Sequence, residues 1–157
     1  MASITRIILH EPDNNAARPL LHERERALHD LRDHGVFRPV NDTAAPYDVA
    51  LSIEESRLVV RIRNAEDAEL PMLVLSLQPY RRLIRDYFLM IEGHEQARRE
   101  SHHSRLQTID MARRGLHNEG AELLIERLQG KIDMDFDTAR LFFTLICSLH
   151  QDKNLLR

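Results

Sequence analysis

Several things that would point to a function are scarce in this sequence. Cys147 is the single cysteine among 157 residues, so no disulfide can form within the chain, which fits a reducing compartment. No Cys/His spacing resembles a zinc finger, and we expect no metal or other cofactor. The first ten residues lack a basic leader, and the apolar runs are shorter than the roughly 20 residues that cross a bilayer. We therefore expect a cytoplasmic protein without a membrane partner.

Charge of one sign is also lacking. The formal net charge is −3, with charged residues at 30%, whereas a general binder of polyanions is strongly basic. The basic residues are unusual in kind, with 20 arginines and two lysines. Arginine suits bidentate recognition of phosphate and carboxylate, but a GC-rich genome produces the same bias. The chain is arginine-rich for one of these two reasons.

Motifs of the common enzyme classes are missing. There is no G-x-S-x-G, no P-loop and no G-x-G-x-x-G. Cys147 lies within an apolar helical pattern, where it is expected to be a small buried side chain. Nothing in the sequence therefore indicates an enzyme, and the question of catalysis stays open.

What is present is a change of periodicity within a single expected domain, 1–157, from a strand-rich part (1–78) to a helical part (79–157). Alternating apolar residues predict strands over 4–10, 47–54 and 58–63. A helix that Gly35 ends lies between the first two of these. Glu55 and Ser56 form a plausible turn. Residues 70–77 are apolar on both faces, which predicts the most covered strand of the sheet.

Helices are predicted for the remainder. Apolar residues from Tyr80 to Ile91 follow helical spacing, and further helices are expected before Gly115, from Asn118 to Gly130, and from about Asp137 onward. The order is β-α-β-β-β-α-α-α, with one further helix possible at the end. The fold class is α+β: a small, largely antiparallel sheet of three to four strands, with about five helices packed mainly on one face.

The most suggestive segment is 113–122, read as a corner between two helices. In that reading the first turn after Asn118 offers free N–H groups to an anion, beside two guanidinium groups and an imidazole. The candidate anion-binding residues are Arg113, Arg114, His117, Asn118 and Glu119, with His117 and Glu122 as weak catalytic candidates. The alternative is a purely structural corner, in which Gly115 ends one helix and Asn118 caps the next.

Two other groups are weaker. Arg81, Arg82 and Arg85, with further arginines up to Arg105, could contact RNA or DNA phosphates, although a solvated face explains them as well. The histidines His94, His102 and His103 are poorly spaced for one metal ion, so we expect a solvated polar stretch there.

Three stretches resemble a known family. They are Leu75–Arg82, Ile109–Gly120 and Asp135–Arg140 with the following Phe143–Cys147. They are similar to an alphaproteobacterial family of uncharacterised proteins, numbered 0262 among such families, over about residues 4–150. The resemblance implies a bacterial, stand-alone protein, and it implies no activity, cofactor or catalytic residue.

These observations favour a non-enzymatic interaction or regulatory module, whose partner is another protein or a second copy of the chain. The apolar last helix, extended by Leu155 and Leu156, is the expected contact surface. The alternative is a small enzyme or sensor for a phosphate- or carboxylate-bearing ligand at residues 113–122. A second alternative is contact with RNA or DNA through the arginines of residues 81–105, although nucleic acid is not the partner we expect.

Overall fold

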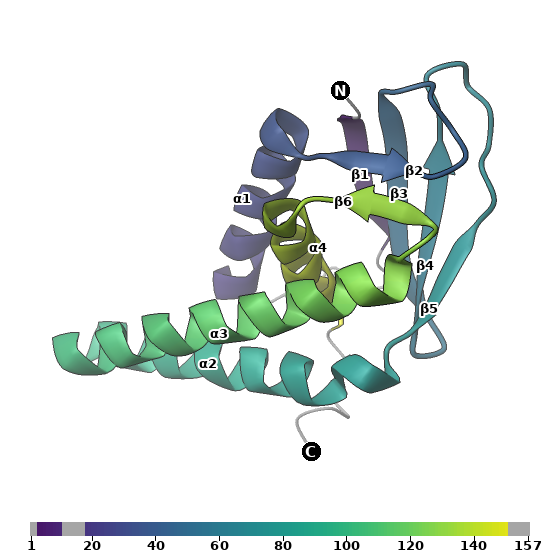
Figure 1. The fold of residues 1–157 in the computed structure, drawn as a ribbon. Helices are drawn as coiled ribbons and strands as arrows, with labels where there is room; N and C mark the ends of the chain where they lie inside the picture. Colours follow the sequence, from purple (N-terminus) through teal and green to yellow (C-terminus); the bar gives the residue numbers. More distant parts are fainter. Residues whose placement is uncertain (1–2, 11–17, 151–157) are drawn as a thin grey trace.

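A mixed four-stranded sheet forms one side of the molecule, and the helices lie together on the other side (Figure 1). The computed structural model describes residues 3–10 and 18–150. The strands of this sheet are β1 (Ile4–His10), β3 (Tyr47–Glu54), β4 (Arg57–Arg63) and β5 (Leu73–Ser76), in spatial order β1-β3-β4-β5. The predicted strands at 4–10, 47–54 and 58–63 are therefore confirmed.

The direction of β1 differs from the rest of the sheet. β3, β4 and β5 form the predicted antiparallel meander, but β1 pairs with β3 in parallel, Ile8 lying beside Ala50. Parallel neighbours need a long crossover, and the helix α1 (Arg18–His34) lies within the connection here. The expectation of a largely antiparallel sheet thus misses its one parallel pair.

The turn between β3 and β4 consists of Glu55 and Ser56, as predicted. Both residues have positive φ, 52° and 63°, which is the conformation of a type I′ hairpin turn. This turn matches the right-handed twist of the two strands, so the hairpin forms although neither residue is glycine or asparagine.

A second, two-stranded sheet pairs β2 (Phe37–Pro39) with β6 (Ile132–Met134). The Phe37 ring stacks on that of Phe142 at a centroid distance of 5.7 Å and meets the Tyr47 ring edge-on at 6.1 Å. The ribbon thereby joins the sheet to the last helix. It was not predicted, because strands of three residues carry too little periodicity.

The last helix, α4 (Phe136–Leu149), is the centre of the core. Every residue from Phe142 to Leu149 is buried, and the helix packs against α1 and α3 (His103–Leu128). Its residues from Phe142 to Leu149 therefore build the interior, so this part of the last helix does not form the expected contact surface. Leu155 and Leu156 lie outside the described residues.

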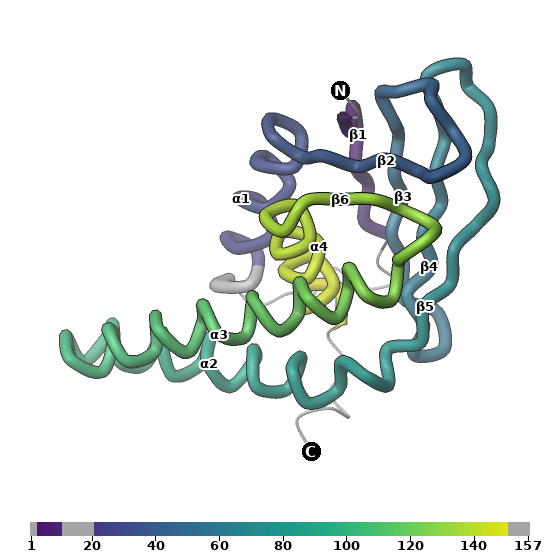
Figure 2. Tube along the Cα trace, in the orientation of Figure 1, coloured from purple at the N-terminus to yellow at the C-terminus, as the bar shows by residue number. Residues whose placement is uncertain are grey.

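α2 (Arg81–Arg99) and α3 form an antiparallel pair. The short 3-10 turn η1 (Gln78–Tyr80) leads into α2. The end of the pair where the chain turns from α2 to α3 extends beyond the other helices (Figure 2). None of the helices within the described ranges is long and apolar enough to span a bilayer.

The α+β class is confirmed, with two corrections. In the described chain there are four α-helices where about five were expected, because residues 106–128 form one helix and not two. β5 is shorter than the predicted strand 70–77 and lies at the sheet edge, with Val74 43% exposed, so it is not the most covered strand.

Candidate functional site

The predicted corner at residues 113–122 is wrong. These residues lie in the middle of α3, which is continuous from His103 to Leu128, so Gly115 ends no helix and Asn118 caps none. Glycine inside a helix costs about 1 kcal/mol relative to alanine. Packing of the same helix through buried Ala121 and Leu124 outweighs that cost. No free helix N-terminus therefore exists at Asn118 to attract an anion.

The continuous helix separates the candidate residues. Arg113 and His117, one turn apart, face the body of the protein and are partly buried, whereas Arg114, Asn118 and Glu122 are exposed. Glu119 binds Arg82 of α2, with 2.7 Å between Oε2 and Nη2. Of the predicted set, Arg113 and His117 alone come together.

Other elements complete a polar cluster around these two residues. We call it the His117 cluster, and it consists of Glu23, Tyr87, Arg113, His117, Arg140 and Thr144. Glu23 comes from α1, Tyr87 from α2, and Arg140 and Thr144 from α4. None of these four was predicted as a site residue, because they lie on three other helices and no sequence motif connects them to His117.

His117 is held by aromatic rings and by one hydroxyl group. Its ring lies 5.7 Å from that of Tyr87 and 6.2 Å from that of Phe143, centroid to centroid. Its Nε2 lies 3.2 Å from Oγ1 of Thr144, and that hydroxyl also lies 3.2 Å from the carbonyl oxygen of Arg140. When Thr144 donates its single proton to the carbonyl, His117 Nε2–H is the donor to Thr144. The other ring nitrogen, Nδ1, then carries the lone pair.

The surroundings keep His117 neutral. Burial is the main cause that lowers its pKa to about 4, and the positive charges of Arg113 and Arg140 contribute to the same shift. At neutral pH the imidazole is therefore uncharged, and the two guanidinium groups carry the positive charge of the site.

Hydrogen-bond donors outnumber acceptors in this cluster. Arg113 Nη2 forms a close ion pair with Glu23, and Arg140 Nη1 lies 3.9 Å from the exposed Asp137. Within the described chain, however, the buried Nε atoms of Arg113 and Arg140 have no hydrogen-bond partner. The hydroxyl of Tyr87 lies close to Thr144 without a hydrogen bond of normal geometry. Buried donors are nearly always satisfied in proteins, so these donors mark a place for acceptor oxygens.

The other sequence candidates do not form sites of this kind. Arg82 is paired with Asp86 and Glu119, while Arg81 and Arg85 are exposed on α2. Further along the pair, Arg98 binds Glu95, and Arg105 lies 4.0 Å from Glu100. Carboxylates therefore interrupt the predicted basic stripe.

The histidines at the far end of the helix pair serve the helices themselves. His102 Nδ1 accepts a hydrogen bond from the backbone N–H of Arg105 and so caps α3, and His94 lies 3.9 Å from Asp110. Among the residues that the structure describes, no three His, Cys, Asp or Glu side chains lie close enough to hold a metal ion. Cys147 is fully buried, and this burial raises the pKa of its thiol.

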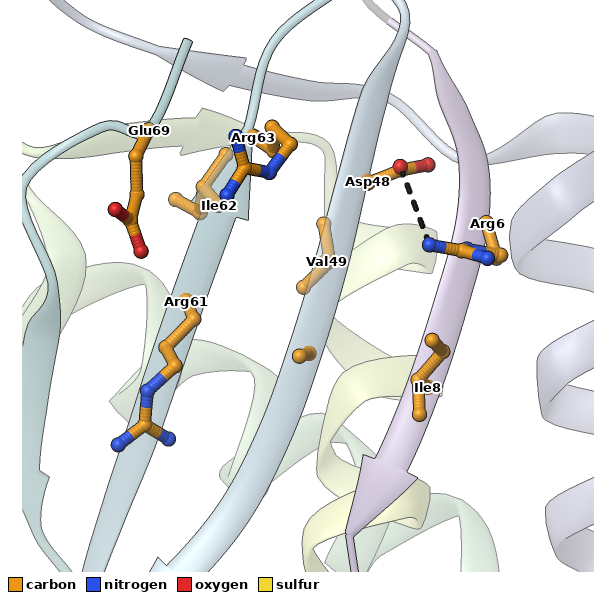
Figure 3. Close-up of a pocket in the computed structure, with 9 residues that line it drawn as sticks. Arg6, Ile8, Asp48, Val49, Arg61, Ile62, Arg63 and Glu69 are labelled. Carbon is orange, nitrogen blue, oxygen red and sulfur yellow. Dashed lines mark ion pairs between the residues drawn. The ribbon is translucent and has the colours of Figure 1, made fainter. Parts of the chain in front are cut away.

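A shallow pocket of about 190 Å³ lies on the opposite side of the molecule, on the sheet face that none of the described helices covers (Figure 3). Side chains of three strands and of the segment after β4 surround it, and Arg6 and Asp48 form an ion pair of 3.6 Å at its rim. The charged side chains that line it are Arg6, Asp48, Arg61, Arg63 and Glu69, with Ile8 and Ala50 between them.

Comparisons with known proteins give a family and no activity. The sequence model of the Uncharacterised protein family (UPF0262) matches residues 1–152. A UPF0262 protein of Erythrobacter litoralis is 51% identical over 132 residues, 82% of each chain. Another, of Mesorhizobium japonicum, is 45% identical over 150 residues, which are 95% of this chain and 93% of that relative. No solved structure matches significantly. The chain therefore belongs to the uncharacterised protein family UPF0262, as its three signature stretches predicted.

Proposed function

We propose that the protein is a non-enzymatic regulatory module of the cytoplasm that binds a small carboxylate- or phosphate-bearing ligand at the His117 cluster. One observation carries the proposal: two buried arginine Nε–H groups, on residues whose charges both act on the neutral His117, have no acceptor in the described chain. An oxyanion supplies several acceptor oxygens at once, and hydrogen bonds between ionised partners are about twice as strong as neutral ones.

The charges of the cluster support an anionic ligand. Arg113 and Arg140 are positive, His117 is neutral, and Glu23 is the one carboxylate in close contact with a guanidinium group. The counter-charge of Arg140 is Asp137, an exposed carboxylate outside the cluster at 3.9 Å, so the positive charge of Arg140 is only weakly neutralised. A bound carboxylate or phosphate would neutralise it, which matters because unpaired charge is costly where water is partly excluded.

Binding is favoured over catalysis by the way His117 is held. Its Nε2 is engaged by Thr144, and its low pKa makes it a weak base at neutral pH. The buried Cys147, whose pKa is raised, is a poor nucleophile. The ligand would instead be recognised and held, and its presence would be reported by the tighter packing of α1, α3 and α4.

Ligand-induced thermal stabilisation tests this proposal. The probes are inorganic phosphate and succinate, and chloride at equal ionic strength is the control for salt effects. Comparing the two probes distinguishes a phosphate-bearing ligand from a carboxylate-bearing one. A ligand at ten times its Kd stabilises the folded state by about 1.4 kcal/mol, so a rise in Tm is expected with at least one probe.

Two variants assign the effect to the cluster. Arg140→Ala removes a cluster guanidinium and should abolish the ligand-induced rise in Tm. Arg114→Ala removes the same charge from an exposed site on α3 and should keep the rise. No rise with either probe, or an equal rise in Arg140→Ala, contradicts the proposal. Circular dichroism confirms that both variants are folded.

A further inference from the structure

The face of the four-stranded sheet that points away from the helices has an ordered pattern of charge. Where β1, β3 and β4 are in register, Arg6 lies beside Asp48, Asp48 beside Arg63, and Arg63 forms a bridge with Glu69. Figure 3 shows these four side chains across the neighbouring segments. The row alternates positive, negative, positive, negative, and we call it the charge row.

A second, shorter row lies at the other end of the same face. Glu54 at the end of β3 lies in register with Arg57 at the start of β4. The signs on the two central strands are the same in both rows: negative on β3 and positive on β4. This repeated order decides how the face can meet another surface.

The area between the two rows is mixed: the polar residues Ser52 and Arg61 lie there together with apolar residues, of which Val59 is buried. Val59 of β4 is in register with Val74 of β5, and Ile8 is in register with Ala50. Val74 is 43% exposed, and Met72, just before β5, is 54% exposed. Residues 70–77 have the apolar pattern of a strand that is covered on both faces. On the outer face of the sheet, however, no helix of the described chain covers them (Figure 1).

We propose that two copies of the chain pack through this face, with a two-fold axis parallel to the strands and between β3 and β4. In that arrangement β3 of one copy lies over β4 of the other. Asp48 then meets the second copy's Arg63, Arg6 meets its Glu69, and Glu54 meets its Arg57. The two-fold axis reverses the order of the strands, so the first residue of the charge row lies over the fourth of the second copy, and the second over the third. Because the four charges alternate in sign, each residue then meets the opposite charge.

The pattern excludes the other simple arrangement of two stacked sheets. A two-fold axis perpendicular to the strands would place Asp48 over the second copy's Glu54 and Arg63 over its Arg57. Like charges would then meet at both ends, and like charges brought together in an interface strongly disfavour the complex. Charge complementarity therefore selects both the occupant, a second copy, and its orientation.

The remaining features of the face fit this arrangement. Sheets pack about 10 Å apart with interdigitating side chains, and the exposed Met72 of one copy would lie over Ile8, at the pocket of the other. Arg61 needs no partner from the second copy, because it is paired with Glu54 at 3.3 Å within its own chain. The inference is independent of the proposed ligand, since the His117 cluster lies among the helices.

Sedimentation velocity with charge-reversal variants tests the proposal. The wild-type chain is expected to dimerise. In the Arg63→Glu variant, residue 63 of each copy would face Asp48 of the other, so two pairs of carboxylates would meet in each dimer. The dissociation constant should therefore rise at least about tenfold. Asp48→Arg alone should do the same through paired guanidinium groups. Both side chains are partly exposed, at 38% for Asp48 and 44% for Arg63, so the fold should tolerate the changes.

A mixture of the two variants is the decisive sample. A heterodimer of Arg63→Glu with Asp48→Arg restores opposite charges at both positions, so mixing should recover dimers that neither variant forms alone. Arg114→Glu, an equal charge reversal on the exposed side of α3, serves as the control and should remain dimeric. A monomeric wild-type chain, a dimeric Arg63→Glu variant, or a mixture that stays monomeric would each overturn the proposal.

Discussion

Gly120 of α3 lies directly against the ring of Phe143 of α4. A β-carbon at position 120 would overlap three carbons of that ring, closer than β-carbons approach other atoms in real structures. The absence of a side chain at Gly120 therefore sets how closely α3 approaches α4. The His117 cluster depends on this approach, because His117 is on α3 and Thr144 is on α4.

The contact predicts opposite effects for two glycines of one helix. Gly120→Ala should destabilise the protein by about 1–3 kcal/mol, because overpacking forces the ring or the helix to move. Gly115→Ala is the matched control, since its added β-carbon would have no atom within 4 Å beyond its chain neighbours and the backbone of its own helix. It should stabilise by up to about 1 kcal/mol through helix propensity. Urea unfolding measures both, and equal effects would refute the close-approach explanation.

The neutral state of His117 predicts a pH dependence of stability. The native pKa is about 4 against about 6.5 in the unfolded chain, so between these values the unfolded state binds more protons. The free energy of unfolding should therefore fall as the pH is lowered from 6.5 to 4, by about 2–3 kcal/mol from this residue. His117→Gln should lack this contribution, while His103→Gln, on the exposed start of α3, should keep it. Identical pH profiles for wild type and His117→Gln would count against the buried neutral imidazole.

The β3–β4 turn predicts an improved hairpin. Glu55 and Ser56 both hold positive φ, where side chains other than glycine and asparagine cost about 1–2 kcal/mol. Glu55→Asn combined with Ser56→Gly should raise the free energy of unfolding by about 1 kcal/mol, because this pair is favoured in type I′ turns. Ser56→Ala retains the strain and should give no gain. A destabilised double variant would mean that the turn has another conformation.

The burial of Cys147 predicts an unreactive thiol. Its side chain is 0% exposed and its pKa is raised, so a thiol reagent such as DTNB should not label the native protein at neutral pH. The same reagent should titrate one thiol per chain in urea. Rapid labelling without denaturant would show that α4 opens readily.

Long amphipathic patterns were the predictable part of the fold. The spacing from Tyr80 to Ile91 predicted a helix, and α2 contains that segment and continues to Arg99. The helix end predicted at Gly115 is wrong, because glycine ends helices in some contexts and is tolerated within them in others. Neighbouring elements decide between these, and α2 and α4 hold α3 straight through Gly115.

The candidate site was predictable in part for a similar reason. Arg113 and His117 were candidates because guanidinium and imidazole groups occur together in residues 113–122, read as a corner between two helices. They come together for another reason, since one turn of the continuous helix α3 separates them. Arg140, Thr144 and Glu23 could not be, since their relation to His117 arises when α1 and α4 pack against α3. The pattern of residues 70–77 likewise shows that the side chains are apolar, but it does not show whether a helix covers them.

The packing of α4 against α1 has a consequence for how fast the chain folds. Arg24 donates hydrogen bonds to the hydroxyl and to the carbonyl oxygen of Ser148, at 3.1 and 2.7 Å, across 124 residues of sequence. Contacts of such long separation require a large loss of chain entropy before they form, and proteins dominated by them fold in milliseconds to seconds. Because α4 joins the two ends of the described chain through α1, we expect the sheet and the helices around it to gain their full stability together, in one cooperative step.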